Sequence, residues 1–145
     1  MGREGERRVE LLSRSTSLIC IVQEMRNLVR MSRGGIRVPE VVLLRNQVLL
    51  MSFIGQEGKA APKLKDAAER MSGEDLGSAY SQVVEMMRTL YSVCHLVHAD
   101  LSEYNILWWN KEAWFIDVSQ AVEPNYPAGE KTASFVLTHL IMASD

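Results

Sequence analysis

The feature that most constrains this sequence is the polar segment of residues 98–105, His-Ala-Asp-Leu-Ser-Glu-Tyr-Asn, which is followed twelve residues later by Asp117. Apolar residues at 106–109 and 113–116 enclose the tripeptide Asn-Lys-Glu, a pattern that predicts a β-hairpin. The polar segment and Asp117 therefore lie at the ends of predicted strands. Any fold of the chain has to present these polar side chains on two adjacent loops.

These residue types suit phosphoryl transfer from ATP, which needs little covalent help from a protein. A carboxylate has to accept or orient the proton of the acceptor, and oxygen ligands have to hold Mg²⁺ against the phosphates. Asp100 fits the first task. Asn105 and Asp117 fit the second, because Mg²⁺ prefers hard oxygen donors. The four residues between Asp100 and Asn105 match the spacing of a protein kinase catalytic loop.

The alternative is a solvated turn, since Asp, Ser and Asn favour turns through local hydrogen bonds. Asp100 and Asn105 alone would not separate the two interpretations. The apolar strands on both sides of the loop, together with Asp117, favour the functional one. His98 follows two apolar residues, so we expect it to be a packed, hydrogen-bonded structural residue rather than an acid or base.

The first half of the chain predicts a helix followed by a hairpin. Apolar residues recur at helical spacing over 20–31, a segment that carries Glu24, and Gly34-Gly35 follow as a stop signal. Aliphatic runs at 41–44 and 48–51 are separated by Arg-Asn-Gln, which predicts two antiparallel strands.

The middle of the chain predicts a linker and then a long helix. Residues after Gly55, as far as about Met71, are rich in Gly, Ala, Lys and Pro and favour a linker between two lobes. Ser72, with Asp75 three residues later, indicates the start of a helix through a variant of the capping box. Its buried face is predicted to hold Leu76, Tyr80, Val83, Val84, Met87, Leu90 and Tyr91.

Composition narrows the class of protein. A chain of 145 residues that is 47% hydrophobic favours one globular domain. A net charge of −2 gives no broad field for a polyanion, so nucleic acid is not indicated as a partner. Cys20 and Cys94 lie far apart without zinc-ligand spacing, which favours a reducing compartment. No apolar run reaches the roughly 20 residues of a membrane span, and no targeting signal is evident, so we expect a cytoplasmic protein.

Two longer segments resemble a known family. His-Ala-Asp-Leu-Ser-Glu-Tyr-Asn-Ile-Leu at 98–107, with Ile-Asp-Val-Ser-Gln-Ala-Val-Glu-Pro at 116–124, is similar to the RIO atypical protein kinases, especially the third RIO subgroup of animals. The resemblance extends over about residues 22–130, including Glu-Met-Arg-Asn-Leu at 24–28 and Met-Ser-Phe-Ile-Gly at 51–55. Aminoglycoside and choline kinases share the Asp and Asn of the loop but differ in the residues around them.

The resemblance implies roles for individual residues. Asp100 would be the catalytic aspartate, and Asn105 and Asp117 would be the metal ligands. In this family the aspartate at the position of Asp117 has also been proposed to accept the phosphoryl group itself, as an aspartyl phosphate. The nucleotide-binding residues would be Met51 behind the adenine, the backbone of Ser52 and Ile54 at the hinge, and Glu24 as the helix carboxylate that pairs with a phosphate-binding lysine. For Met51 the alternative is core packing, and for Glu24 it is an exposed helix charge.

The ends of the chain depart from the family pattern. Residues 1–21 contain no lysine and only Gly2 and Gly5, so neither the glycine-rich loop nor the strand lysine of kinases is recognisable. We therefore expect three regions: a poorly ordered lead-in at 1–19, a partial RIO kinase domain at 20–130, and a divergent tail at 131–145. Within that domain, residues 20–55 would be the remnant of a small lobe and residues 72–130 the large lobe. Compared with the family, we expect the chain to be truncated at its N-terminus.

The resemblance implies an α+β, two-lobed, protein-kinase-like fold with an incomplete small lobe. It also implies ATP and Mg²⁺ as ligands and a transferase activity, either a serine/threonine kinase or an ATPase switch. Members of the family act on pre-ribosomal particles or signalling partners, but no residue here selects a protein substrate. The alternatives are a catalytically impaired fragment that acts as a binding scaffold or has no function and, with less support, a small-molecule phosphotransferase.

Overall fold

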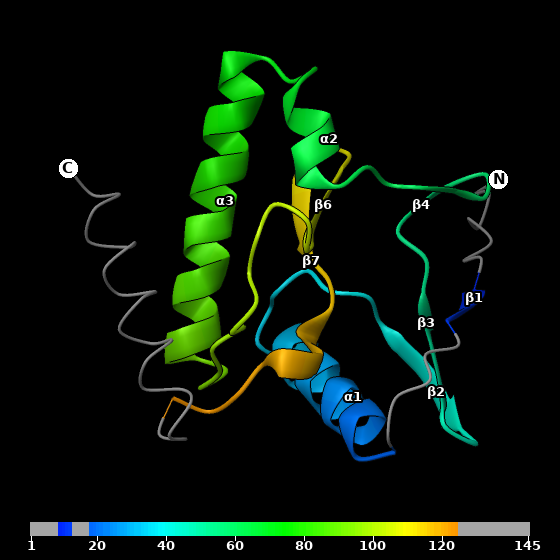
Figure 1. Ribbon diagram of the computed structural model, residues 1–145. Helices are drawn as coiled ribbons and strands as arrows, with labels where there is room; N and C mark the ends of the chain where they lie inside the picture. Colours follow the sequence, from blue (N-terminus) through cyan, green and yellow to red (C-terminus); the bar gives the residue numbers. More distant parts are fainter. Residues whose placement is uncertain (1–8, 13–17, 125–145) are drawn as a thin grey trace, which may run out of the picture.

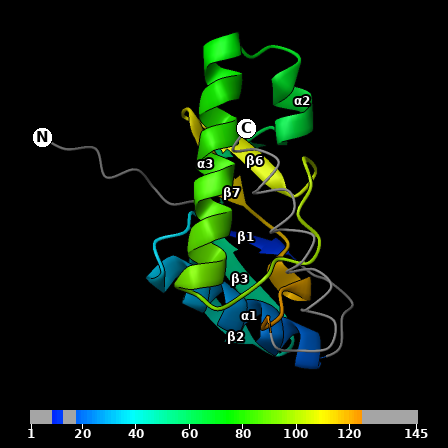
Figure 2. The same ribbon diagram turned by 90° about the vertical axis from the view of Figure 1, so that its left-hand side faces the viewer.

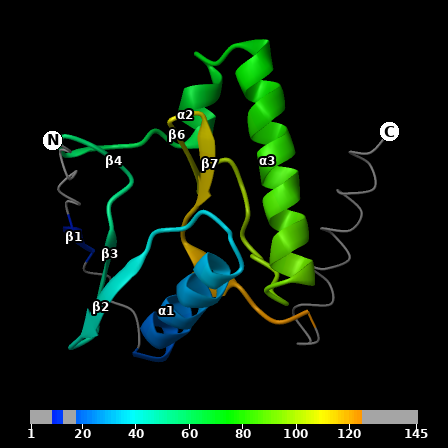
Figure 3. The ribbon, with the colours of Figure 1, turned by 180° about the vertical axis from the view of Figure 1, so that it is seen from behind.

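The computed structural model describes residues 9–12 and 18–124, which form an α+β fold in two lobes (Figure 1). The small lobe holds α1 and a three-stranded sheet, and the large lobe holds α2, α3 and the hairpin β6–β7 (Figures 1 and 3). The elements in chain order are β1 (Val9–Leu12), α1 (Leu18–Arg33), β2 (Val41–Arg45), β3 (Val48–Ser52), β4 (Gly55–Gln56), β5 (Lys59–Ala60), α2 (Leu64–Ala68), α3 (Gly73–Ser92), β6 (Ile106–Trp109), β7 (Glu112–Phe115) and the 3₁₀ turn η1 (Val118–Gln120).

Both predicted hairpins are confirmed. β2 and β3 pair antiparallel across Asn46 and Gln47, which have φ of 48° and 63°, and β6 and β7 pair across Asn110 and Lys111, with φ of 49° and 62°. Two consecutive residues with positive φ are the mark of the type I′ turn, whose twist matches that of the flanking strands. Asn at the first position tolerates this conformation, so each turn sets the register of its hairpin.

The predicted lead-in contains a strand that the sequence did not reveal. β1 pairs antiparallel with β3, with Val9 opposite Ser52 and Leu12 opposite Leu49, so the sheet order is β1-β3-β2. Residues 9–12 of the predicted lead-in are thus part of the sheet of the small lobe. Four residues are too few to show a period, and the strand depends on a partner about 40 positions away. Residues 18 and 19 of the predicted lead-in begin α1, while the rest of the lead-in and the predicted tail at 131–145 lie outside the described residues.

The first predicted helix is confirmed as α1, and its end follows from the two glycines. The Ile36 amide donates to the Met31 carbonyl and the Gly35 amide to the Ser32 carbonyl, both at 3.0 Å, while Gly35 has φ of 86°. This is the Schellman motif, in which a residue with left-handed conformation ends the helix. A Cβ on Gly34 would lie 2.3 Å from the Cys94 sulfur, so close packing also requires glycine there.

The predicted linker has more structure than its composition suggested. It contains the short hairpin β4–β5 and the helix α2. The Trp108 amide donates to the Pro62 carbonyl at 2.9 Å, and the Lys65 amide to the Glu103 carbonyl at 3.2 Å. These bonds attach the second half of the segment to β6 and to the polar loop before it, so this half belongs to the large lobe. Composition could not show this attachment to the large lobe, because the bonds use backbone groups rather than side chains.

The second predicted helix is confirmed as α3, but part of its predicted buried face is wrong. The Ser72 hydroxyl accepts from the Asp75 amide at 3.1 Å, as the capping pattern predicted. Leu76, Tyr80 and Tyr91, which were predicted to be buried, are exposed. The buried residues of the helix are Ala79, Met86 and Leu90, with Val83 and Met87 partly buried against the core. The sequence contains two overlapping apolar stripes at helical spacing, and contact with the rest of the lobe decides between them.

One hydrophobic core connects the two lobes. It includes Leu28 and Met31 of α1, Leu49 of β3, Leu90 of α3 and Phe115 of β7, all buried. In two views at right angles, α1 and η1 lie side by side below the β6–β7 hairpin (Figures 1 and 2). The shared core therefore holds α1, η1 and the β6–β7 hairpin in place around the space between the lobes. In the described part of the chain no helix has the length and apolar character to cross a bilayer.

Candidate active site

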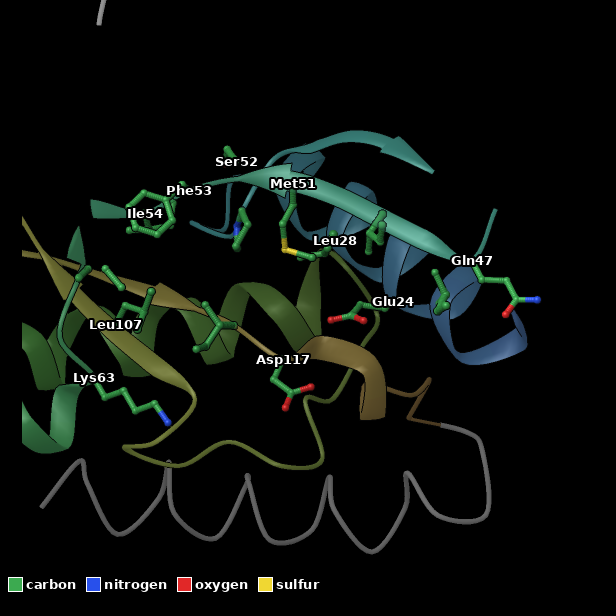
Figure 4. A pocket seen from close by; sticks show the side chains of 16 residues that line it. Glu24, Leu28, Gln47, Met51, Ser52, Phe53, Ile54, Lys63, Leu107 and Asp117 are labelled. Atoms are coloured by element: carbon green, nitrogen blue, oxygen red, sulfur yellow. The ribbon is translucent and has the colours of Figure 1, made fainter. Parts of the chain in front are cut away.

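A pocket of about 420 Å³ lies between β3, α1 and the β6–β7 hairpin (Figure 4). The Met51 side chain enters it from β3, with its sulfur toward the interior, and Leu107 lies on the opposite side (Figure 4). The lining residues are Ile21, Glu24, Leu28, Pro39, Gln47, Leu49, Met51, Ser52, Phe53, Ile54, Ala60, Ala61, Lys63, Leu107, Ile116 and Asp117. An apolar slot with a few polar groups at one end is the usual form of a small-molecule site.

The segment after β3 forms one edge of the pocket. The Ser52 amide donates to the Glu40 carbonyl at 2.8 Å, and the Ile54 carbonyl accepts from the Ala61 amide at 2.9 Å. Gly55, at φ 150°, has no room for a Cβ, which would meet the Lys59 carbonyl oxygen. These two bonds occupy the Ser52 amide and the Ile54 carbonyl. The Ser52 carbonyl and the Ile54 amide are therefore the candidates for contact with a planar ring.

The polar loop places Asp100 and Asn105 together. The Asn105 side-chain nitrogen donates to the Asp100 backbone carbonyl at 2.9 Å and to its carboxylate at 3.1 Å. Both partners can only accept, so the nitrogen of the Asn105 amide has to face them and its oxygen is directed elsewhere. The Ile116 amide donates to the Asn105 carbonyl at 3.0 Å, which brings this loop beside Asp117. Asp100 and Asn105 are not among the residues that line the pocket, and they lie next to it through this contact.

Asp117 stands at the turn between β7 and η1. Its backbone has φ of 55° and ψ of 61°, a left-handed conformation that is uncommon outside glycine. The Ser119 hydroxyl donates to the Asp117 carboxylate at 3.0 Å. Glu24 of α1 lies across the pocket from Asp117, so carboxylates from the two lobes face the same space (Figure 4). Glu24 is half-buried there, which favours the pocket role over an exposed helix charge.

His98 is buried and supports the loop rather than facing the pocket. Its Nε2 lies 3.1 Å from the Ile116 carbonyl oxygen, and its Nδ1 accepts from the Asp100 amide at 3.4 Å. A carbonyl only accepts, so Nε2 carries the proton and the ring is neutral. Burial lowers the pKa of His98 from its ordinary value, although the Ile116 carbonyl and the charges of Asp100 and Asp117 act in the opposite direction. The geometry agrees with the structural role predicted for this residue.

The donor set suits a magnesium ion better than a metal with a full protein shell. The described residues contain no cluster of three or more His, Cys, Asp or Glu side chains. An amide oxygen of Asn105 and a carboxylate of Asp117 come from adjacent loops, with Glu24 across the pocket. Mg²⁺ takes oxygen ligands, often one or two from protein with the rest from water and phosphate. The residues present therefore fit Mg²⁺.

Some residues of the site were missed in the sequence. Lys63 precedes α2, and its side chain runs along the pocket toward the end where Asp117 lies (Figure 4). Leu107 and Phe53 line the apolar part, and the buried Asn27 contacts the turn after Asp117. The signal for Asn27 was available, because an amide side chain between Glu24 and Leu28 interrupts the apolar face of a helix. For Lys63, in a segment predicted to be a linker, there was no comparable signal.

Comparison with known proteins bears on both family and fold. A family model described as RIO domain matches residues 3–134. The Homo sapiens serine/threonine-protein kinase RIO3 is 53% identical over 107 residues, 74% of this chain and 20% of that protein. The Dictyostelium discoideum serine/threonine-protein kinase rio1 is 50% identical over 105 residues, 72% of this chain and 18% of that protein. The chain thus spans about a fifth of the length of these curated relatives.

A solved structure supports the predicted architecture. The crystal structure of the Rio2 kinase-ADP/Mg²⁺-phosphoaspartate complex from Chaetomium thermophilum has a TM-score of 0.67 at 21% identity, covering 97% of this chain and 44% of that one. The kinase-like fold and the resemblance to RIO kinases predicted from the sequence are confirmed. The family match reaches further toward both ends than the residues 22–130 that the resemblance covered.

Proposed function

Since the chain belongs to the RIO domain family, we propose that it binds ATP with Mg²⁺ and transfers the terminal phosphoryl group, as a serine/threonine kinase or an ATPase switch. The observation that carries this proposal is that the loop holding Asp100 and Asn105 is bonded to Ile116, beside Asp117, which lines a pocket with an apolar slot. Each of these side chains was assigned a role in phosphoryl transfer from its position in the sequence. Their convergence in space supports the same chemistry.

The pocket divides into a part for the base and a part for the phosphates. Adenine fits between Met51 and Leu107, with its edge at the backbone of Ser52 and Ile54. The phosphates then extend toward Asp117. Mg²⁺, when bound, would neutralise the charge that develops on the transferred group. Asn105 and Asp117 would hold the ion, and Asn105 is oriented for this task by its bonds to Asp100.

In the kinase version of the reaction, Asp100 is the group that accepts a proton. The hydroxyl oxygen of a serine or threonine acceptor attacks the γ-phosphorus, the hydroxyl proton passes to the Asp100 carboxylate, and the bond to the bridging oxygen breaks to release ADP. In the ATPase version, an Asp117 oxygen attacks the γ-phosphorus and the bond to the bridging oxygen breaks to release ADP. Water then attacks the phosphorus of the acyl phosphate, which releases inorganic phosphate and restores the Asp117 carboxylate. The phosphoaspartate named for the Rio2 relative is the reason to include this version.

A second candidate is a nucleotide-binding scaffold with suppressed turnover. In kinases the strand ahead of the small-lobe helix carries a lysine for the phosphates. Here β1 precedes α1 and pairs with β3, but its residues Val9, Glu10, Leu11 and Leu12 include no lysine. In GTPases a single arginine on the transferring phosphates is worth roughly 10³-fold or more in rate. This observation predicts slow turnover with nucleotide binding retained.

Calorimetric titration of the chain with ATP, with and without Mg²⁺, tests the proposal. We expect binding that requires the metal and that weakens about tenfold or more in Asp117→Asn, because metal ligation loses a carboxylate charge. Asp66→Asn, an exposed aspartate of α2, is the matched control and should bind as the wild type does. Absence of binding by folded wild-type protein would contradict the proposal.

Turnover assays then separate the versions of the reaction. Radiolabel transferred from γ-labelled ATP to a serine or threonine acceptor indicates a kinase. Label retained on the chain that is released by hydroxylamine indicates an acyl phosphate, which Asp117→Asn should abolish. Nucleotide binding with neither product would favour the scaffold.

The setting of this activity is part of the same proposal. We place the protein in the cytoplasm, because Cys20 and Cys94 lie far apart in the sequence without the spacing of a disulfide framework, which favours a reducing compartment. Pre-ribosomal or signalling complexes are the partners suggested by the family. Subcellular fractionation with an antibody to the chain, followed by analysis of co-sedimentation with ribosomal precursors, would check both points.

A further inference from the structure

A buried amide on α1 is hydrogen-bonded to the turn that follows Asp117. The Asn27 side-chain nitrogen donates to the carbonyl oxygens of Val118 and Ala121, each at 3.0 Å. Asn27 is 3% exposed. In two views at right angles, η1 lies against α1 (Figures 1 and 2). Both amide hydrogens are therefore used to attach one element of the small lobe to the loop that carries a metal ligand.

The backbone on both sides of Asp117 is held in this way. The preceding carbonyl, of Ile116, accepts from the buried His98 ring at 3.1 Å, and the following carbonyl, of Val118, accepts from Asn27. Asp117 itself is in the left-handed region. A non-glycine residue keeps such a conformation where its surroundings determine it. The buried side chains of Asn27 and His98, one from each lobe, hold the backbone of Asp117 in this conformation.

The same helix presents a second acidic residue to the pocket. Glu24 lies one helical turn before Asn27 and lines the pocket opposite Asp117 (Figure 4). Residues three apart share one face of a helix, so Asn27 and Glu24 face the metal loop together. A displacement of α1 would therefore move Glu24 and release the Val118 and Ala121 carbonyls at once.

We propose that Asn27 is a positioning residue, which sets the orientation of Asp117 for Mg²⁺ and couples α1 to the metal loop. This inference rests on the proposed function, because it assigns Asn27 a role in the metal-dependent part of nucleotide binding. Asn27 touches neither the nucleotide slot nor the ion. It acts through the backbone of the residue that follows Asp117.

Nucleotide binding to Asn27→Ala and Asn27→Ser tests the coupling. The measured quantity is the ratio of ADP affinities with and without Mg²⁺, determined by calorimetry at a temperature where all variants are folded. Residues that orient a metal ligand typically cost about 10–100-fold in metal affinity when replaced. We expect the ratio to fall about tenfold or more in Asn27→Ala, with ADP affinity in the absence of Mg²⁺ unchanged. Asn27→Ser keeps one donor and should recover part of the ratio.

A purely structural Asn27 would give a different result. The melting temperature of Asn27→Ala would fall while the ratio stayed at the wild-type value, and that outcome overturns the inference. Asn110→Ala, at an exposed turn in the large lobe, is the control for loss of an asparagine: it should leave the ratio at the wild-type value while the melting temperature falls, because alanine is strained at a φ of 49°.

Hydrogen exchange distinguishes failure of this inference from failure of the proposed function. If the wild type showed no metal-dependent binding, the proposed function would fail, and exchange in the protein without nucleotide would still test the positioning. We expect Asn27→Ala to speed exchange of the Ile116, Ala121 and Val122 amides more than that of the Trp108 amide, all of which are bonded in the structure. Uniform acceleration, or none, would show that Asn27 does not hold the metal loop.

Discussion

At the scale of single residues, the pocket has one basic side chain among its described lining residues, Lys63. It comes from the segment before α2 rather than from the strand that carries the lysine in kinases. Lys63 also lies 6.0 Å from the ring centroid of Tyr104, a residue of the polar loop. Its side chain runs along the pocket toward Asp117 (Figure 4), so in the proposed complex we expect it to face the ribose or phosphates of the nucleotide.

We predict that Lys63→Met weakens ATP binding by about 2- to 10-fold, the range expected for one exposed charge near the phosphates. The loss should shrink at high salt, because an exposed charge is screened. Fluorescence titration at two salt concentrations measures both effects. Lys59→Met, on β5 outside the pocket, is the control. Equal affinities for Lys63→Met and the wild type at low salt would exclude Lys63 from the nucleotide site.

His98 determines a dependence of stability on pH. Its folded-state pKa is lowered, chiefly by burial, below the ordinary value of about 6.5 that the unfolded chain would show. The unfolded state therefore binds more protons between these two values, and the free energy of unfolding decreases as pH falls below about 6.5. Above that pH the contribution is fully present.

Thermal melts of the wild type and His98→Gln between about pH 8 and pH 5 check this prediction. Glutamine can still donate to the Ile116 carbonyl but does not titrate, so the fall in melting temperature below about pH 6.5 should be smaller in the variant. His95→Gln, the same substitution at an exposed position, is the matched control. Parallel curves for His98→Gln and the wild type would contradict the assignment.

At the scale of elements, the connection between α1 and β2 is attached to the large lobe through Arg37. Its Nε donates to the Ala113 carbonyl and its Nη2 to the Gln82 side-chain oxygen, each at 2.8 Å. The same Gln82 oxygen accepts from the Ala113 amide at 3.0 Å. The Phe115 amide in turn donates to the Arg37 carbonyl at 2.9 Å. The α1–β2 connection, β7 and α3 are thus joined by one polar network.

Replacing Arg37 with Met should lower the free energy of unfolding by about 1–3 kcal/mol, because the Ala113 carbonyl and the Gln82 oxygen each lose a donor. Urea denaturation measures the change. Gln82→Met alone and the double variant complete a mutant cycle, in which we expect a coupling energy of about 0.5–3 kcal/mol. Arg45→Met, exposed at the end of β2, is the control. Additive effects of Arg37 and Gln82 would show that the network does not act as a unit.

At the scale of the whole molecule, the hydrophobic core crosses the boundary between the lobes. Leu28 of α1 and Leu49 of β3 belong to the same buried cluster as Leu90 of α3 and Phe115 of β7. Neither lobe encloses a separate core in the described residues. Cooperative unfolding follows from such a shared core, because neither part can keep its buried surface without the other.

We predict one calorimetric transition, with equal calorimetric and van't Hoff enthalpies. Phe115→Leu, at a fully buried position in the centre of the cluster, should lower that single transition by an amount corresponding to roughly 1 kcal/mol or more, without splitting it. Differential scanning calorimetry measures the number of transitions and both enthalpies. Two resolved transitions in either protein would mean that the lobes fold independently.

Local chemistry explains which features could be predicted. The turns at Asn46 and Asn110, the glycine stop after α1 and the cap at Ser72 depend on neighbouring residues, and the structure has all four where they were expected. The clustering of Asp100, Asn105 and Asp117 also followed from local pattern, because two strands joined by a short turn bring their ends together.

The sequence by itself therefore determined both hairpins, both long helices and the residue types of the candidate catalytic end of the pocket. Only the tertiary structure decided that Val9–Leu12 pairs with β3, which apolar stripe of α3 is buried, and that Asn27 and Lys63 belong to the site. Periodicity, caps and turns are encoded within a few residues. Strand pairing, the choice between helix faces and the contacts of a buried amide depend on groups far apart in the chain, whose positions are set when the whole core packs.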